Sequence, residues 1–327
     1  MMTSRYLSPS RIANAATRIT LKAASPILRS WERKSVARYS SEALKHQPVF
    51  IIGAPRTGST ILYQILSNQF DVIYIDNLIC RFHNNLLTGC KLSDRLFAGR
   101  PHNCFDSDNG DTSAGGLRAP AECGEFWYRW LPSDRHFIDY DDISQAMIDG
   151  VRDEIAAVIN FYDRPILFKN LNAGQRLRLL SQCFPDARFI YVDRDPIYTA
   201  QSILLAKRRL GLPDNEFWSI MPRNVSNLRS LDAYRQIIRQ IYFLQKQIHE
   251  DRQLFPESNF LTVQYSRLKD DYKHTVDRCG VLVGATARTD YIEPDIRVVE
   301  RQKLDAEEFA AFETEIDGLD WVNYQSE

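Results

Sequence analysis

The stretch from Val49 to Leu62 reads Val-Phe-Ile-Ile-Gly-Ala-Pro-Arg-Thr-Gly-Ser-Thr-Ile-Leu. Its first four residues are apolar, which is typical of a short strand buried on both faces of a parallel sheet. The chain then turns between Gly53 and Gly58, and an apolar helical pattern begins at Ser59. A glycine-bounded loop between a strand and a helix binds anions, because backbone N–H groups and the helix dipole point into it. This stretch therefore predicts a phosphate-binding loop.

The residues inside the loop indicate which phosphate it binds. The spacing Gly53-x-x-x-x-Gly58-Ser59 is that of a Walker A loop, but Ser59 stands where that motif has lysine. The lysine normally reaches the β- and γ-phosphates of a nucleoside triphosphate, so ATP chemistry would lack its main cation here. Arg56 lies inside the turn instead, and hydroxyl groups are supplied by Thr57, Ser59 and Thr60. This set suits a single phosphate that carries a small charged group.

Further apolar runs alternate with helical patterns along the chain. The runs expected to form strands lie at 72–75, 166–169, 188–193 and 260–263, and helices are expected at about 59–69, 143–159, 174–183, from 196, 234–248 and 271–283. This alternation predicts an α/β fold with a mostly parallel central sheet of about five strands flanked by helices. Right-handed crossovers would bring the loop at 53–59, Lys169 and Arg194 to one edge of that sheet, where ligands bind in such folds.

A second phosphate-binding element is predicted around Arg194. It follows the strand Arg188–Asp193, and Ser202 comes eight residues later, about two turns into the next helix. A guanidinium binds phosphate through paired, charge-assisted hydrogen bonds. The alternative is that Arg194 only pairs with the neighbouring Asp193 or Asp195.

The phosphate loop and the segment Phe184-Pro-Asp-Ala-Arg-Phe-Ile-Tyr-Val-Asp-Arg-Asp-Pro196 together resemble the PAPS-dependent sulfotransferases, PAPS being 3′-phosphoadenosine 5′-phosphosulfate. The resemblance covers about residues 47–283, and Phe260–Leu268 is similar to the last strand of that family and its following turn. It implies a P-loop NTPase-like three-layer sandwich. It also implies in-line transfer of a sulfuryl group from PAPS to a hydroxyl or amine acceptor, with PAP as product and no metal requirement.

The resemblance also assigns roles to individual residues. The 5′-phosphate would be held by Arg56, Thr57, Gly58, Ser59 and Thr60, and the 3′-phosphate by Arg194 and Ser202. Lys169 matches the lysine at the end of the family's third strand, next to the bridging oxygen and the sulfuryl group. A compact ammonium suits the charge that develops on a leaving phosphate. Arg56, Lys169 and a general base would thus form the catalytic set.

Two departures from the family pattern concern the nucleotide. Arg56 stands where cytosolic members often have lysine, and no Arg-Lys-Gly-x-x-Gly segment is present for the 3′-phosphate. The chain therefore looks closer to the bacterial and tyrosylprotein-type members than to the cytosolic ones. The 3′-phosphate contact would rest on Arg194 and Ser202, with an arginine of 207–229 such as Arg208 as a candidate helper.

The general base is expected among four residues. Glu122 is preferred, because Pro120-Ala121-Glu122 resembles the stretch that carries the glutamate in the bacterial and tyrosylprotein-type branches. Glu125 is the alternative base, since it lies beside Glu122 between a glycine-rich loop and an aromatic run. His102 and His136 stand in no recognisable motif, and packing or surface roles are the simpler interpretation for them. A solvated or helix-capping role remains open for Glu122 as well.

The N-terminal segment differs in composition from the rest of the chain. Residues 1–45 hold nine lysines and arginines against Glu32 and Glu42, although the whole chain carries a net charge of −1. Apolar residues recur there at spacings of three and four, namely Ile12, Ala16, Ile19, Ala23, Ile27 and Trp31. We expect a basic amphipathic arm at 1–46 that packs on the body or contacts an anionic surface or another copy. A mitochondrial transit peptide is the alternative.

The remaining 47–327 would form the sulfotransferase domain, with irregular insertions at about 77–125 and 210–229. Six scattered cysteines without a C-x-x-C pair argue against a zinc site and fit free thiols in a reducing compartment. No apolar run approaches membrane-spanning length. We therefore expect a cytoplasmic protein, organellar if residues 1–40 are a transit peptide. Its partner would be a small-molecule, carbohydrate or peptidyl acceptor and not a nucleic acid.

The sequence leaves two other functions open. A P-loop kinase is disfavoured by Ser59 in the lysine position and by the lack of an obvious Walker B aspartate, since Asp193 precedes an arginine. A catalytically silent PAPS- or PAP-binding protein would keep both phosphate elements and lack a base. The choice between the silent protein and the enzyme depends on Glu122.

Overall fold

The computed structural model describes the backbone of residues 9–214, 216–296 and 300–321, and the side chains from Ser25 onward. Its centre is a sheet of five strands in the order β2-β3-β1-β4-β5. The strands are β1 (Val49–Gly53), β2 (Ile73–Tyr74), β3 (Ile166–Lys169), β4 (Arg188–Asp193) and β5 (Phe260–Gln264). Every neighbouring pair is parallel. The predicted parallel five-stranded sheet is confirmed.

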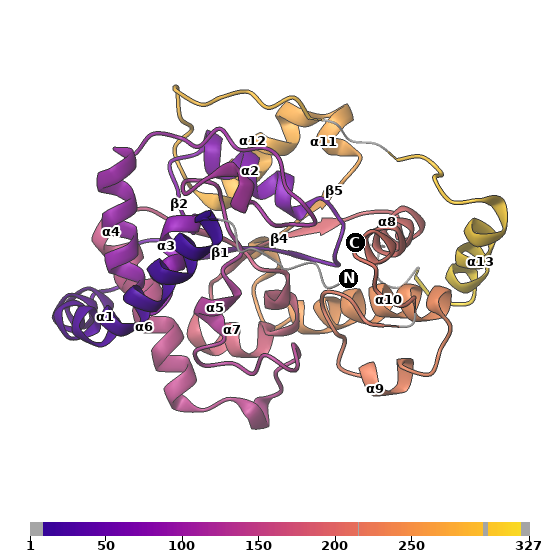
Figure 1. The fold of residues 1–327 in the computed structure, drawn as a ribbon, viewed down its shortest axis with the longest axis horizontal. Helices are drawn as coiled ribbons and strands as arrows, with labels where there is room; N and C mark the ends of the chain where they lie inside the picture. The colour runs from indigo at the N-terminus through magenta and orange to yellow at the C-terminus, as the bar shows by residue number, and fades with distance from the viewer. Residues whose placement is uncertain (1–8, 215, 297–299, 322–327) are drawn as a thin grey trace.

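Helices cover both faces of this sheet. Successive side chains of a strand point to opposite faces, so each face carries apolar side chains that the helices bury. Phe50 and Ile52 of β1 face one cluster, and Val49 and Ile51 face the other. The helices on the first face are α5 (Gly124–Trp127), α6 (Gln145–Tyr162), α7 (Leu177–Cys183) and the C-terminal part of α10 (Ala233–Arg252). The helices on the second face are α2 (Ser59–Gln69) and α12 (Tyr272–Val283). Figure 1 shows the resulting three layers, as predicted.

The remaining helical elements surround this sandwich. The α-helices are α1 (Pro9–Ser40), α3 (Asn77–Arg81), α4 (Leu86–Phe97), α8 (Pro196–Arg209), α9 (Val225–Leu228), α11 (Arg267–Asp270) and α13 (Ala306–Asp317). Short 3-10 turns lie at Ser113–Gly115, Tyr140–Asp142, Leu171–Gln175 and Glu257–Asn259. α13 had no sequence prediction; it packs on α8 and α10, with Phe312 buried and its ring 5.2 Å from that of Tyr234.

The stretch 77–125 is less irregular than expected from the sequence. It contains α3 and α4, and α4 buries Leu86, Leu87 and Cys90 on one face. Asp76 caps α3 by accepting a hydrogen bond from the Ile79 backbone N–H at 2.7 Å. The stretch is polar overall, and the apolar face of α4 spans only about two turns of helix. The prediction of an irregular segment was therefore wrong for α3 and α4. The glycine-rich part, 107–116, contains the short turn Ser113–Gly115 and an isolated antiparallel bridge between Asp108 and Asp111.

The insertion at 210–229 is anchored by α10. Gln240 Nε2 donates to the backbone oxygens of Trp218 and Ile220, at 2.9 and 2.6 Å. Apart from the single-turn helix α9, its described residues form no helix or strand beyond the end of α8. Trp218, Ser219 and Ile220 are thereby held over the carboxyl edge of the sheet.

The C-terminal half of α1 packs on the body of the protein. The ring centroids of Tyr39 and Phe161 are 5.2 Å apart, and Glu32 accepts hydrogen bonds from the backbone N–H of Leu87 and Thr88. The apolar face that the sequence predicts for α1 does not pack on the body at the two positions described, since Ile27 and Trp31 are 58% and 76% exposed. The other members of that face, from Ile12 to Ala23, lie outside the described side chains. In the described part of the chain, no helix has the length and apolar character needed to cross a membrane.

Candidate active site

The loop after β1 is shaped by close approaches of the neighbouring chain. Gly53 has a φ of 149°, and a Cβ there would lie 2.5 Å from the Val192 backbone oxygen. Gly58 has a φ of 89°, and a Cβ there would lie 2.3 Å from the ring of Tyr265. Any side chain at either position would therefore collide with its neighbour. The hydroxyl of Thr57 donates to the Ala54 backbone oxygen at 2.9 Å and closes the turn.

Two arginines meet beside this loop. Arg56 has a φ of 69°, and its Nε donates to Ser202 Oγ at 3.0 Å. Arg194 Nη1 donates to the Arg56 backbone oxygen at 2.9 Å. Burial, and then the nearby Arg194, lower the pKa of Arg56. Two adjacent cations with this environment favour an anion between them.

Arg194 and Ser202 both contact Arg56, so both lie beside the loop at 53–59, where the sequence places them. Asp193 and Asp195, the alternative partners of Arg194, have other roles. Asp193 accepts hydrogen bonds from Gln245 and Gln264, and Asp195 caps α8 at the Ile197 N–H. The Arg194 side chain instead pairs with Glu300, at 3.2 Å between Nε and Oε1, and lies over the ring of Tyr265.

Lys169 and Glu122 form an ion pair at the carboxyl end of β3. Lys169 is buried, with 3% of its side chain exposed, whereas Glu122 is 37% exposed. Gly110 of the glycine-rich segment lies against both of them. A Cβ at Gly110 would be 3.1 Å from Glu122 Oε1, 3.6 Å from Lys169 Nζ and 3.7 Å from Thr60 Oγ1. These three polar groups therefore converge on one point under the segment 107–116.

A cavity of about 210 Å³ joins these groups at the carboxyl edge of the sheet. Residues predicted from the sequence supply much of its lining, namely Arg56, Gly58, Ser59, Thr60, Glu122, Lys169 and Arg194. Thr57 and Ser202 stand behind that lining and contact the loop through the bonds described above. The convergence of three strand ends, expected from the parallel topology, is present in the structure.

The other sequence candidates lie elsewhere. Glu125 is exposed on α5, and the Cys80 thiol lies 3.6 Å from its Oε2. His102 is buried, with Nδ1 accepting from the Cys104 N–H and Nε2 beside Ser67 Oγ. His136 accepts from the Met221 N–H and lines a separate cavity. Burial lowers the pKa of both histidines to about 4. Arg208 pairs with Glu308 and Asp214.

The sequence and fold of the chain match one protein family. A family model described as "Sulfotransferase family" matches residues 48–284. The chain belongs to the sulfotransferase family. The matched range agrees with residues 47–283, over which the sequence resembles the PAPS-dependent sulfotransferases. The fold is the P-loop-like α/β fold of this family.

Individual relatives are distant. The chain is 24% identical over 265 residues to the omega-hydroxy-beta-dihydromenaquinone-9 sulfotransferase Stf3 of Mycobacterium bovis and of Mycobacterium tuberculosis. The match covers 74% of this chain and 64% of those proteins. Among solved structures, the sulfotransferases STF9 of Mycobacterium avium and STF1 of Mycobacterium tuberculosis superpose with TM-scores of 0.51 and 0.50, each at 15% identity. The superposition with STF9 covers 99% of this chain and 80% of STF9, and that with STF1 covers 93% of this chain and 81% of STF1. At this level of identity, these structures support the fold alone.

Several cavity residues were not singled out from the sequence. Tyr265 directly follows β5 at the same sheet edge, so its place at a strand end was a signal for it. Trp218, Ser219 and Ile220 come from the second insertion, and Asn172 follows β3. Glu300 reaches Arg194 from 106 residues away in the sequence, and no local pattern signals that contact.

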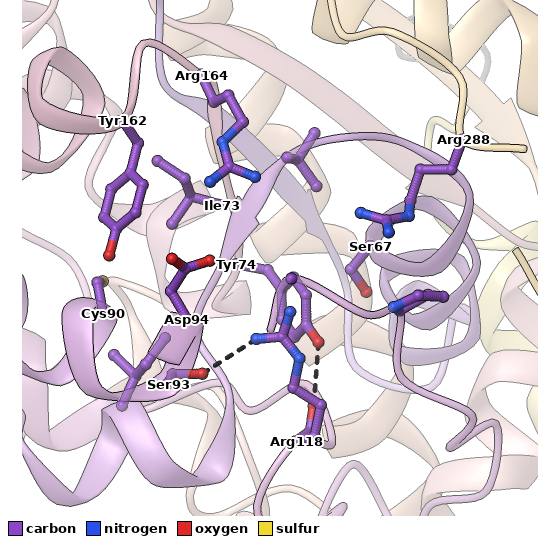
Figure 2. A pocket seen from close by; sticks show the side chains of 14 residues that line it. Ser67, Ile73, Tyr74, Cys90, Ser93, Asp94, Arg118, Tyr162, Arg164 and Arg288 are labelled. Carbon is purple, nitrogen blue, oxygen red and sulfur yellow. Dashed lines mark hydrogen bonds between the residues drawn. The ribbon is translucent and has the colours of Figure 1, made fainter. Parts of the chain in front are cut away.

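A second hollow lies beside the edge strand β2, and Figure 2 shows three arginines around it. Arg118 pairs with Asp76 at 3.1 Å and donates to Ser93 Oγ at 3.0 Å. Arg164 and Arg288 both approach Asp71, at 2.8 and 3.7 Å. Each of these cations has a carboxylate partner, so the hollow is explained as an ion-pair network that holds the sheet edge.

Proposed function

We propose that this protein transfers a sulfuryl group from PAPS to an acceptor hydroxyl or amine and releases PAP. The observation that carries the proposal is the Lys169–Glu122 ion pair in a cavity that the phosphate loop and Arg194 also line. A cation for a leaving phosphate and a carboxylate for an acceptor proton thus lie together at one end of a phosphate site. Membership of the sulfotransferase family supports the same activity.

The residues of the donor side fit a nucleotide with two separate phosphate groups. The amides of the loop, the N-terminus of α2 and the Arg56 side chain would hold the 5′-phosphate. Arg194 and Ser202 would hold the 3′-phosphate, with Arg56 linking the two because its Nε contacts Ser202 Oγ at 3.0 Å. Two carboxylates lie near these guanidiniums, since Glu300 pairs with Arg194 and the charge of Asp108 acts on Arg56.

The acceptor side would use Glu122 and Lys169. PAPS supplies an activated sulfuryl group when bound. Glu122 would accept the proton of the acceptor hydroxyl as the new S–O bond forms and the bond to the phosphate oxygen breaks. Lys169 would stabilise the negative charge on the departing phosphate, and its 3% exposure strengthens that interaction by excluding water. Trp218 and Ile220 would border the acceptor, since they line the same cavity.

The acceptor class is part of the proposal. The Mycobacterium relatives are named for an omega-hydroxy compound, which supports a hydroxyl acceptor here, although the chain spans only 64% of their length. The hydroxyl would belong to a small molecule, a carbohydrate or a peptide. We further propose that residues 1–46 form an arm, that residues 47–327 form the sulfotransferase domain, and that the protein is cytoplasmic.

Phosphate transfer from ATP is the competing function. The loop has Ser59 in place of the Walker lysine, and the cavity lysine comes from β3 instead. A silent PAP-binding protein is the other competing function, and in it the Lys169–Glu122 pair would only hold the loop before α5 in place. Calorimetry on the purified protein tests the donor assignment: PAP should bind far more tightly than AMP. Equal affinity for the two nucleotides would contradict it.

A further inference from the structure

Three metal-ligating side chains gather outside the cavity. Cys80 of α3, Cys123 at the start of α5 and Glu125 of α5 each place one ligand atom within 4.8 Å of the other two. Cys80 and Cys123 are 43 residues apart in the sequence. That separation explains why the cysteine spacing gave no signal of a metal site. None of the three lines the cavity of the active site.

The distances suit a bound cation. The Cys80 Sγ and Glu125 Oε2 atoms are 3.6 Å apart. In a tetrahedral zinc site, with Zn–S of about 2.3 Å and Zn–O of about 2.0–2.2 Å, a sulfur and an oxygen ligand lie about 3.5–3.7 Å apart. Cys123 Sγ lies 3.9 Å from the Cys80 backbone oxygen, and it is within 4.8 Å of the ligand atoms of both Cys80 and Glu125. A cation could therefore enter with little movement of the backbone.

The donor set selects the kind of cation. Two thiolates with one carboxylate favour zinc and similar soft or borderline metals, whereas magnesium and calcium prefer oxygen ligands alone. Glu125 is exposed and Cys80 is half-buried, so solvent reaches the cluster. Solvent access provides a fourth ligand in the form of water.

We propose that Cys80, Cys123 and Glu125 bind one zinc-type divalent cation, with water as the fourth ligand. On binding, the two thiols release their protons to solvent and the thiolates coordinate the metal. The cation links α3 to the start of α5. Because Cys123 directly follows Glu122, the link also fixes the backbone that carries the proposed base; this consequence rests on the proposed function.

The test uses the full chain without an affinity tag, purified under reducing conditions. Elemental analysis should find about one zinc per chain. After the metal is removed, Co²⁺ should give the sulfur-to-cobalt charge-transfer band, and zinc should abolish it and raise the melting temperature. Cys80→Ser and Cys123→Ser should lose the band, and Glu125→Gln should weaken Co²⁺ binding by about 10- to 100-fold. Cys104→Ser, a buried thiol outside the cluster, should keep the band.

Other outcomes would overturn the proposal. Absence of stoichiometric zinc or cobalt in the reduced wild-type protein would do so, whether or not the serine variants fold. Loss of the band in Cys104→Ser to the same extent would also do so. A Cys80–Cys123 disulfide found by mass spectrometry in protein kept reduced would assign the pair to redox chemistry instead. If zinc binds but its removal leaves sulfuryl transfer unchanged, the site stands and only its link to Glu122 is lost.

Discussion

Lys169 and Glu122 form an ion pair across 47 residues of sequence, and Gly110 of the glycine-rich segment lies directly against it. The lysine comes from the end of a central strand and is buried, whereas the glutamate comes from the loop before α5 and is partly exposed. The pair therefore joins the carboxyl edge of the sheet to the loop before α5, which in the proposed function would meet the acceptor. A side chain at position 110 would crowd the pair, because a Cβ there would lie 3.1 Å from Glu122 Oε1.

Removing the carboxylate should affect the rate and spare donor binding. Glu122→Gln keeps the shape and an oxygen that Lys169 can bond, but it cannot accept a proton. General-base loss typically costs about 10²–10⁴ in rate, so turnover should fall by that order while PAP affinity stays nearly constant. Steady-state kinetics and calorimetry on the same preparation check this prediction.

The matched control for this experiment is Glu257→Gln, which changes an exposed acid far from the cavity and should leave turnover unchanged. A loss in Glu125→Gln with none in Glu122→Gln would move the base by three residues. If neither variant is slower, the silent PAP-binding protein becomes the better account.

Replacing Arg194 should remove the preference for a 3′-phosphate. Charge-assisted hydrogen bonds contribute roughly 1.5–3 kcal/mol, so Arg194→Ala should weaken PAP on the order of 10- to 100-fold. AMP lacks the 3′-phosphate, and its affinity should change little. A parallel loss of both nucleotides would mean that Arg194 supports the loop through the Arg56 backbone oxygen and does not read the 3′-phosphate.

Glu300 should compete with the nucleotide for Arg194. Its Oε1 lies 3.2 Å from Arg194 Nε, and the pair is partly screened by solvent, with side-chain exposures of 22% and 10%. A partly exposed pair contributes roughly 0.2–1 kcal/mol, so Glu300→Gln should tighten PAP about two- to fivefold. Glu307→Gln, an exposed acid on α13, serves as the control. Weaker PAP binding in Glu300→Gln would show that Glu300 orients Arg194 for the phosphate.

Acid should destabilise the protein through His102. Burial lowers its pKa to about 4, below the ordinary 6.5, so the unfolded chain takes up a proton that the folded chain does not. Stability is therefore lost as the pH falls from 6.5 to about 4. Protonation would break the hydrogen bond from the Cys104 N–H to Nδ1.

Urea unfolding across that pH range measures the effect. The loss assigned to His102 is on the order of 1–3 kcal/mol, and His136 adds a similar dependence. His102→Gln should reduce the pH dependence even though it lowers stability at neutral pH. The exposed His274→Gln should leave the dependence unchanged. An unaltered profile in His102→Gln would contradict the assignment.

The sheet and the positions of the cavity residues at its strand ends were predictable because their signals are local. Apolar runs, loop glycines and residues at strand ends determine the positions of Arg56, Lys169 and Arg194, and parallel topology brings them together. Contacts made by distant segments had no such signal. Glu300 reaches Arg194 from beyond α12, Cys80 meets Cys123 across the first insertion, and α4 has its apolar face within a polar stretch. These features depend on tertiary packing, which overrides local patterns.

The transfer of labelled groups distinguishes sulfuryl transfer from phosphoryl transfer. Labelled sulfate should pass from PAPS to a suitable hydroxyl acceptor without added magnesium, because in the proposed function Lys169 and the loop amides would offset the charge that develops on the leaving phosphate. Labelled γ-phosphate should not move from ATP with or without Mg²⁺, because Ser59 stands where a triphosphate needs lysine. Magnesium-dependent transfer of phosphate from ATP, with no transfer of sulfate from PAPS, would contradict the account.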